Sequence, residues 1–213
     1  MAEWTIKKSQ NPTPDAERER IIEAPTFGTH FTDHMVTVVW EKDKGWHSAT
    51  VEPYGPIMMD PSAAVLHYGQ EIFEGIKAYR HQDGSIWTFR PEANAKRLQL
   101  SARRMALPEV PVDMFIESLV KLMEVDGAWV PEPKNEKTLY FRPFEIAAED
   151  FLGVRPAHRA EYRVIASPVG PYFTGGLKPV SIWIALDSAS LRSFSVGIVR
   201  RRFVASAFLM TRQ

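Results

Sequence analysis

Two helical patterns follow one another in the middle of the chain. After Pro91, which can occupy a first helical turn, apolar residues recur at steps of three and four as far as Ala106. A second apolar stripe begins after Pro111 and ends before Trp129. Its members are Val112, Phe115, Ile116, Leu119, Leu122 and Met123. The sequence therefore predicts two consecutive amphipathic helices.

Segments with strand character precede these helices. Residues 11–20 are polar and broken by proline, and residues 27–33 and 35–40 then turn apolar in the manner of a strand. Farther along, residues 76–80 and 85–89 flank an Asp-Gly turn. This dipeptide readily adopts the positive φ that tight hairpins need. We expect an arm that leads into a sheet, followed by a hairpin.

Strands resume after the helices, at residues 138–147, 162–166 and 180–184. The order of strands, then two helices, then strands favours an α+β fold over a doubly wound one. The chain can bury one sizeable core or two small ones, because 45% of its 213 residues are hydrophobic.

Charge and cysteine content limit the partners of this chain. Lys plus Arg and Asp plus Glu both number 26, so no overall field favours nucleic acid or an anionic membrane. A small neutral or zwitterionic ligand fits better. Cysteine is absent from the sequence, which excludes disulfides and thiolate metal sites and is compatible with a reducing cytosol. No run approaches the roughly 18 apolar residues of a membrane span, and the N-terminus lacks a signal-peptide core, so we expect a cytoplasmic protein.

Three short segments carry motifs. Residues 67–80 read His-Tyr-Gly-Gln-Glu-Ile-Phe-Glu-Gly-Ile-Lys-Ala-Tyr-Arg, residues 139–143 read Leu-Tyr-Phe-Arg-Pro, and residues 167–173 read Ser-Pro-Val-Gly-Pro-Tyr-Phe. In this order they closely resemble the N-terminal half of the branched-chain amino acid aminotransferases, which are fold-type IV enzymes that use pyridoxal 5'-phosphate. The resemblance extends over residues 5–184.

The resemblance implies a small α+β domain over residues 1–170, a linker at 171–178 and the truncated start of a larger domain at 179–213. It also implies transfer of the amino group of leucine, isoleucine or valine to 2-oxoglutarate, in a homodimer. One alternative is another fold-type IV enzyme, a D-amino acid aminotransferase or an aminodeoxychorismate lyase, which the Phe-Glu-Gly and Tyr-Phe-Arg-Pro segments disfavour. The other is a non-catalytic binding or oligomerisation module made from the small domain.

Arg97 is the candidate for holding the cofactor. A guanidinium offers a fixed fork of donors that suits a phosphate dianion. By itself, an arginine on a helix is usually part of a solvated face. In the family that the chain resembles, the arginine at the matching place holds the phosphate of the cofactor.

Tyr140 and Arg142 lie two residues apart in a predicted strand, so their side chains emerge on one face. The resemblance implies that Tyr140 lines the side-chain pocket and that Arg142 receives the distal carboxylate of glutamate or 2-oxoglutarate. The alternative is a structural strand in which Arg142 pairs with a nearby carboxylate.

The resemblance also implies a pocket for the branched aliphatic side chain of the substrate. The matching positions are Phe31, Tyr68, Phe73, Val154 and Tyr172. In the family, the loop that contains Val154 reaches the active site of the dimer partner. Taken singly, without the resemblance, each of these aromatic residues is more typical of core packing.

The lysine that would bind the cofactor as an imine is missing from the pattern. In the family a glycine-rich segment supplies it a few dozen residues after the last motif, and nothing similar occurs before Gln213. Lys77 and Lys178 lack the surrounding glycines, so neither takes that role. We therefore expect little or no transaminase activity from this chain.

Composition changes near Asp187. Every acidic residue lies at or before this position, and the charged residues beyond it are all arginines. One interpretation is that the coding frame was lost after Ile184 or Asp187, which leaves an out-of-frame tail on a truncated enzyme. The other is a short basic, partly apolar helix or strand that packs against the rest.

Two weaker motifs give no site. His30 and His34 lie four residues apart, but no carboxylate cluster accompanies them, so we expect a structural or hydrogen-bonded role rather than a metal site. The glycines at residues 170–176 resemble a phosphate loop only superficially, because no Lys-Ser/Thr pair follows them.

Overall fold

Two long antiparallel strands form the centre of a mixed sheet. The computed structural model describes residues 3–171. The central strands are β7 (Thr138–Ala147) and β8 (Arg159–Val169), which pair from Thr138 with Val169 to Ala147 with Ala160. Beyond β8 the sheet continues with β2 (His34–Glu41), β3 (Gly45–Pro53) and the short parallel strand β1 (Thr5–Ile6). All other pairings in the described sheet are antiparallel.

On its other edge β7 pairs with two short strands in succession. These strands are β4 (Glu71–Phe73) and β5 (Ile76–Arg80), and β6 (Ile86–Thr88) completes a hairpin with β5. The predicted hairpin is thus confirmed, with Gly84 at a φ of 83° in its turn. Between β4 and β5 the ladder is interrupted at residues 74 and 75.

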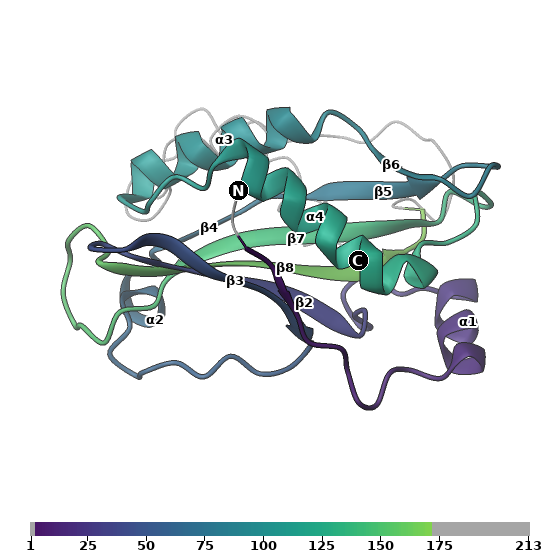
Figure 1. Ribbon diagram of the computed structural model, residues 1–213, viewed down its shortest axis with the longest axis horizontal. Coiled ribbons are helices and arrows are strands. Elements are labelled where there is room, and N and C mark those ends of the chain that lie inside the picture. The colour runs from purple at the N-terminus through teal and green to yellow at the C-terminus, as the bar shows by residue number, and fades with distance from the viewer. Residues whose placement is uncertain (1–2, 172–213) are drawn as a thin grey trace, which may run out of the picture. The chain divides into compact units, whose positions relative to one another are not determined.

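Two helices cover one face of this sheet (Figure 1). They are α3 (Pro91–Met105) and α4 (Val112–Asp126), and a 3₁₀ turn, η1 (Gly127–Trp129), extends α4. Both lie where the apolar spacing predicts them. Their buried side chains, Leu98, Phe115 and Leu122 among them, join one core with the sheet residues Phe141 and Tyr162.

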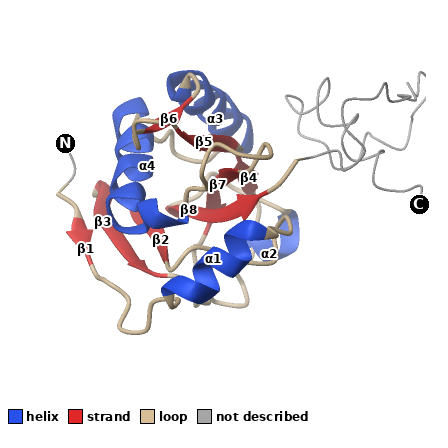
Figure 2. Cartoon of the chain, turned by 90° about the vertical axis from the view of Figure 1, so that its right-hand side faces the viewer, coloured by secondary structure: helices blue, strands red, loops and turns tan. Residues whose placement is uncertain are grey.

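Two shorter helices lie on the other side of the sheet, as Figure 2 also shows. These are α1 (Asp15–Glu23) and α2 (Ala64–Tyr68). The arrangement confirms an α+β fold. Among the described residues no helix has the length and apolarity that a membrane crossing requires.

Some local predictions are wrong. The arm at residues 11–20 contains most of α1, a polar helix in which Arg18 pairs with Asp15 and Arg20 with Glu17. Residues 27–33 form a turn followed by irregular loop rather than a strand. The predicted strand at residues 180–184 lies outside the described residues.

His34 fastens the N-terminal arm to the body of the fold. Its Nε2 accepts the backbone N–H of Ser9 at 2.8 Å, so the ring proton is on Nδ1, which donates to Asp126 at 2.7 Å. The neighbouring Asp33 accepts hydrogen bonds from Thr13 of the arm. His34 therefore has the structural role that the sequence predicts.

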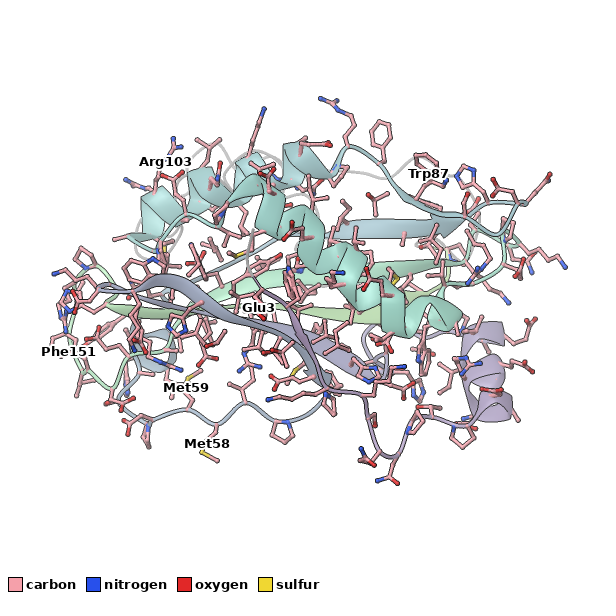
Figure 3. The ribbon with its side chains drawn as sticks, viewed as in Figure 1. Glu3, Met58, Met59, Trp87, Arg103 and Phe151 are labelled. Atoms are coloured by element: carbon pink, nitrogen blue, oxygen red, sulfur yellow. The ribbon has the colours of Figure 1, made fainter. Side chains whose placement is uncertain are left out.

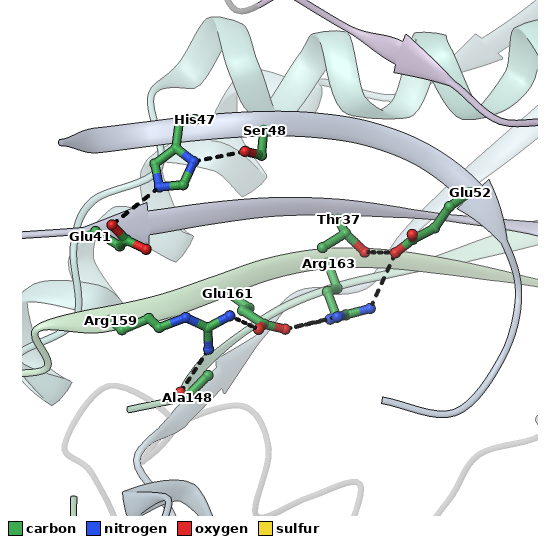
Figure 4. Close-up of polar contacts among 9 residues, drawn as sticks. All are labelled: Thr37, Glu41, His47, Ser48, Glu52, Ala148, Arg159, Glu161 and Arg163. Carbon is green, nitrogen blue, oxygen red and sulfur yellow. Dashed lines mark hydrogen bonds and ion pairs between the residues drawn. The ribbon is translucent and has the colours of Figure 1, made fainter. Parts of the chain in front are cut away.

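A row of charged side chains crosses the sheet on the face away from α3 and α4 (Figure 4). Glu161 accepts hydrogen bonds from Arg159 at 2.6 Å and from Arg163 at 2.8 Å, and Arg163 reaches Glu52 at 3.8 Å. Thr37 donates to Glu52 at 2.6 Å. Glu161 and Arg163 are both buried. Because each charge has a partner, the row satisfies the condition under which charges are buried in proteins.

Glu145, on the opposite face of the sheet in β7, is a buried carboxyl group that has no such partner. It is fully buried, and neither carboxyl oxygen has a hydrogen-bond partner. Burial raises the pKa of Glu145 to about 9. The side chain is therefore a neutral carboxylic acid at neutral pH.

We predict that Glu145→Leu stabilises the folded chain most strongly at alkaline pH. An unfolded glutamate ionises near pH 4.3, so between roughly pH 5 and 9 the unfolded state binds fewer protons, and stability falls by up to about 1.4 kcal/mol per pH unit. Urea unfolding at about pH 5, 7 and 9 should show that the variant loses this slope. Glu71→Leu, at an exposed position of β4, is the matched control. Equal slopes in the wild type and Glu145→Leu would contradict the prediction.

Candidate functional site

The site is organised by three consecutive residues at the interruption between β4 and β5. Phe73 ends β4, and Glu74 and Gly75 connect it to β5. The backbone N–H of Glu74 donates to the carbonyl of Pro143 at 2.8 Å, which holds the connection against β7. Phe73, Glu74 and Gly75 each contact a different functional side chain.

Glu74 binds Arg97 of α3. The Arg97 Nε and Nη2 atoms each donate to one carboxylate oxygen of Glu74, both at 2.6 Å. Asn94, one turn earlier on α3, donates to the same carboxylate at 2.9 Å and to the carbonyl of Gly75 at 3.2 Å. Glu74 is buried, whereas 52% of the Arg97 side chain is exposed. The hydrogen bond to Glu74 raises the pKa of Arg97, which therefore stays charged.

Gly75 makes room for Tyr140. A Cβ atom at this position would overlap the phenol oxygen of Tyr140 and lie 3.0 Å from two carbons of its ring. Tyr140 pairs with Lys77 in the register of β5 and β7, so it lies directly beside the connection. Any larger residue at position 75 would therefore force the tyrosine ring to move.

Arg142 lies over the ring of Phe73, with its guanidinium carbon 4.4 Å from the ring centroid. Its Nη2 and Nε atoms donate to the hydroxyl of Tyr140 at 3.0 and 3.2 Å. Within residues 3–171 no carboxylate lies at ion-pair distance from Arg142. The structural alternative, in which Arg142 pairs with a carboxylate of the same domain, is thus not what the described residues show.

A cavity of about 160 Å³ opens beside Tyr140 and Arg142. Its lining comes from the loop before β2 and from strands β7 and β8. The lining residues are Phe27, Gly28, Phe31, Tyr140, Arg142, Ile165, Ala166 and Ser167. Phe27 meets the Tyr140 ring edge-on at 5.5 Å, and Phe31 stacks on Tyr54 at 4.9 Å. The cavity therefore combines aromatic and aliphatic walls with one cationic group.

The structure brings four of the predicted site residues together, and Glu74 connects a fifth, Arg97, to them. Phe31, Phe73, Tyr140 and Arg142 share the cavity or contact a residue that lines it. Arg97 approaches from the helical layer and is connected to them by Glu74, the neighbour of Phe73 in the chain.

The remaining predicted site residues do not join this group. Tyr68 ends α2, is 42% exposed and does not line the cavity. Val154 is 83% exposed in the loop after β7. Figure 3 shows Phe151 of the same loop at the left of the described residues, far from Trp87 of the β5–β6 hairpin at the upper right. Tyr172 lies outside the described residues.

Two site residues are missing from the sequence predictions. Phe27 lines the cavity, and the one signal for it is the neighbouring Gly28, whose φ of 71° allows the tight loop. Glu74 stands in the motif at residues 67–80, but no pattern in the sequence pairs it with Arg97, 23 positions later.

The described side chains of this arrangement are suited to recognising a ligand. Arg142 can form charge-assisted hydrogen bonds with a carboxylate, and the surrounding rings can enclose an apolar body. Arg97 keeps N–H groups beyond those that Glu74 occupies, since a guanidinium carries five. Within the described part of the chain no group of three or more His, Cys, Asp or Glu residues is placed to hold a metal ion.

Sequence comparisons match the chain to one kind of enzyme, although no family model matches it. The branched-chain-amino-acid aminotransferase of Mycolicibacterium smegmatis is 60% identical over 183 residues, which are 86% of this chain and 50% of that protein. The probable branched-chain-amino-acid aminotransferase of Streptomyces coelicolor is 55% identical over 182 residues, 85% of this chain and 50% of that protein. The chain thus spans about half the length of the curated relatives it matches.

The fold gives the same match. The branched-chain aminotransferase of Thermoproteus uzoniensis, solved with norvaline, aligns with a TM-score of 0.50 and 21% identity, over 65% of this chain and 43% of that one. At this identity the likeness concerns the fold alone, while the sequence relatives carry the homology. The chain is therefore homologous to the N-terminal half of the branched-chain-amino-acid aminotransferases.

Proposed function

We propose that this chain is the substrate-recognising half of a pyridoxal phosphate-dependent branched-chain amino acid aminotransferase. The observation that carries the proposal is the Arg142 guanidinium, which lies over Phe73 beside an aromatic cavity and has no carboxylate partner in the described part of the chain. A half-buried cation beside apolar walls suits a ligand that combines a carboxylate with an apolar body. The names of the sequence relatives, which are branched-chain-amino-acid aminotransferases, support this proposal.

The proposed substrates are leucine, isoleucine or valine as amino donor and 2-oxoglutarate as acceptor. Phe31, Phe73 and Tyr140 would pack against the branched side chain, and each fitted methylene contributes roughly 1 to 3 kcal/mol. Arg142 would receive the distal carboxylate of 2-oxoglutarate, with its orientation held by the Tyr140 hydroxyl. Tyr68 and Tyr172 remain proposed as further walls of the pocket.

The proposed cofactor is pyridoxal 5'-phosphate, whose pyridine ring supplies an electron sink when it is bound. Arg97 fits its phosphate, because the guanidinium is half exposed and has N–H groups left over from Glu74. The chain's own contribution is to bind and orient. The sequence contains no lysine in the glycine-rich context of the family, so we propose that this chain alone does not carry out the proton transfer of transamination.

The proposal includes a homodimer in the cytoplasm. Val154 is almost fully exposed and takes no part in the cavity, which supports a contact between its loop and a second copy. The absence of cysteine from the sequence agrees with a reducing compartment. Residues 1–170 would form the small domain, residues 171–178 the linker, and residues 179–213 the start of the larger domain.

We predict that Arg142→Leu weakens the binding of 2-oxoglutarate by about 10- to 100-fold, because hydrogen bonds to a charged group contribute about 1.5 to 3 kcal/mol. Isothermal titration calorimetry on the full chain measures the dissociation constant. Arg104→Leu, an exposed arginine near the end of α3, is the control and should leave it unchanged. Equal affinities in the wild type and Arg142→Leu would remove the basis of the proposal.

We predict that Arg97→Leu weakens the binding of pyridoxal 5'-phosphate by at least about tenfold and leaves the binding of pyridoxal unchanged. The physical reason is that the guanidinium interacts with the phosphate and not with the ring. Fluorescence titration with both ligands measures the two affinities. A parallel loss for both ligands would show that the substitution damages the fold instead.

The purified chain, supplied with pyridoxal 5'-phosphate, leucine and 2-oxoglutarate, should form no glutamate above the background of the cofactor alone. A coupled glutamate assay measures this, and borohydride reduction followed by mass spectrometry tests for a covalent cofactor. Robust turnover, or an adduct on Lys77 or Lys178, would contradict the expectation.

A further inference from the structure

Glu74 is a buried carboxylate that the proposed function does not use. Burying a charge is costly unless it is paired and hydrogen-bonded. Glu74 meets this condition fully, since Arg97 and Asn94 occupy its oxygens. Its neighbours Ile72 and Ile76 in the adjoining strands belong to the apolar core. The buried, ion-paired carboxylate of Glu74 therefore points to a role in the site.

The pair leaves one part of Arg97 free and fixes its direction. Nε and one N–H of Nη2 face Glu74, so the other N–H of Nη2 and both of Nη1 remain. An arginine side chain carries considerable rotamer entropy, and a bidentate contact removes most of it before a ligand arrives. The free donors are thus held in a fixed orientation at a half-exposed position.

The pair also ties this orientation to the substrate cavity. The backbone of Glu74 is bound to the carbonyl of Pro143, the residue that follows Arg142 in β7. Asn94 grips both the Glu74 side chain and the Gly75 carbonyl. These contacts therefore fix the Arg97 guanidinium relative to β7, the strand that carries Tyr140 and Arg142.

We propose that Glu74 is a positioning residue that holds the free edge of the Arg97 guanidinium in place for the phosphate monoester of the cofactor. This inference rests on the proposed function, which assigns the phosphate to Arg97. Glu74 itself touches Arg97, Asn94 and the β7 backbone.

Charge and positioning predict opposite effects when the carboxylate of Glu74 is removed. A negative charge 2.6 Å from Arg97 repels a phosphate dianion, so on charge alone its removal strengthens phosphate binding. If Glu74 orients the guanidinium, its removal weakens phosphate binding. The sign of the change decides between the two accounts.

The test compares Glu74→Gln and Glu74→Asp in the full chain by titration with pyridoxal 5'-phosphate. Glutamine cannot accept both Arg97 donors, and aspartate keeps the charge but is one methylene shorter. We expect both variants to bind about tenfold more weakly, with pyridoxal affinity unchanged. Glu71→Gln, exposed on the adjacent strand, should bind like the wild type. Tighter or unchanged binding of the phosphate by either folded variant overturns the proposal.

A spectroscopic measurement separates positioning from general damage to the fold. The Nε–H resonance of Arg97, identified by its loss in Arg97→Lys, should be protected from exchange in the wild type and exposed in Glu74→Gln. Affinity for 2-oxoglutarate, which depends on Arg142, should persist. If Arg97→Leu does not change pyridoxal phosphate affinity, the proposed function fails. If Arg97→Leu weakens it but the Glu74 variants do not, only this inference fails.

Discussion

The antiparallel pairing of β7 decides which side chains reach each face of the sheet. Its ladder with β8 runs from Thr138 to Ala147 without a break, so alternate residues point to opposite sides. Phe141 and Glu145 lie under the helices, and Tyr140 and Arg142 lie on the other face. A shift of one residue would exchange these two sets. The cavity therefore depends on the register of this strand before it depends on any single contact.

The interruption between β4 and β5 connects the two faces. The register along β7 is the same on both sides of it, since Phe73 pairs with Phe144 and Ile76 with Phe141, so the side chains keep alternating between the two faces. At the break, Phe73 supports Arg142 on one side, and Glu74 reaches Arg97 on α3. Two consecutive residues therefore contact a strand-borne cation on one face and a helix-borne cation on the other.

Much of this arrangement could be predicted from the sequence, where local patterns are strong. The spacing of apolar residues gave α3, α4 and β7, and the two-residue spacing placed Tyr140 and Arg142 on one face. The polar helix α1 was missed because ion pairs rather than an apolar stripe accompany it. The Glu74–Arg97 pair was missed because it joins distant positions, and tertiary packing alone brings them together.

The missing side chain at Gly75 has a consequence for how specificity could change. Because the phenol of Tyr140 fills the space beside this backbone, any larger residue there would displace the ring that borders the cavity and holds Arg142. The shape of the binding surface is thus controlled by a residue that does not itself line the cavity. Variation in ligand preference among homologous chains can arise there while every wall-forming residue stays the same.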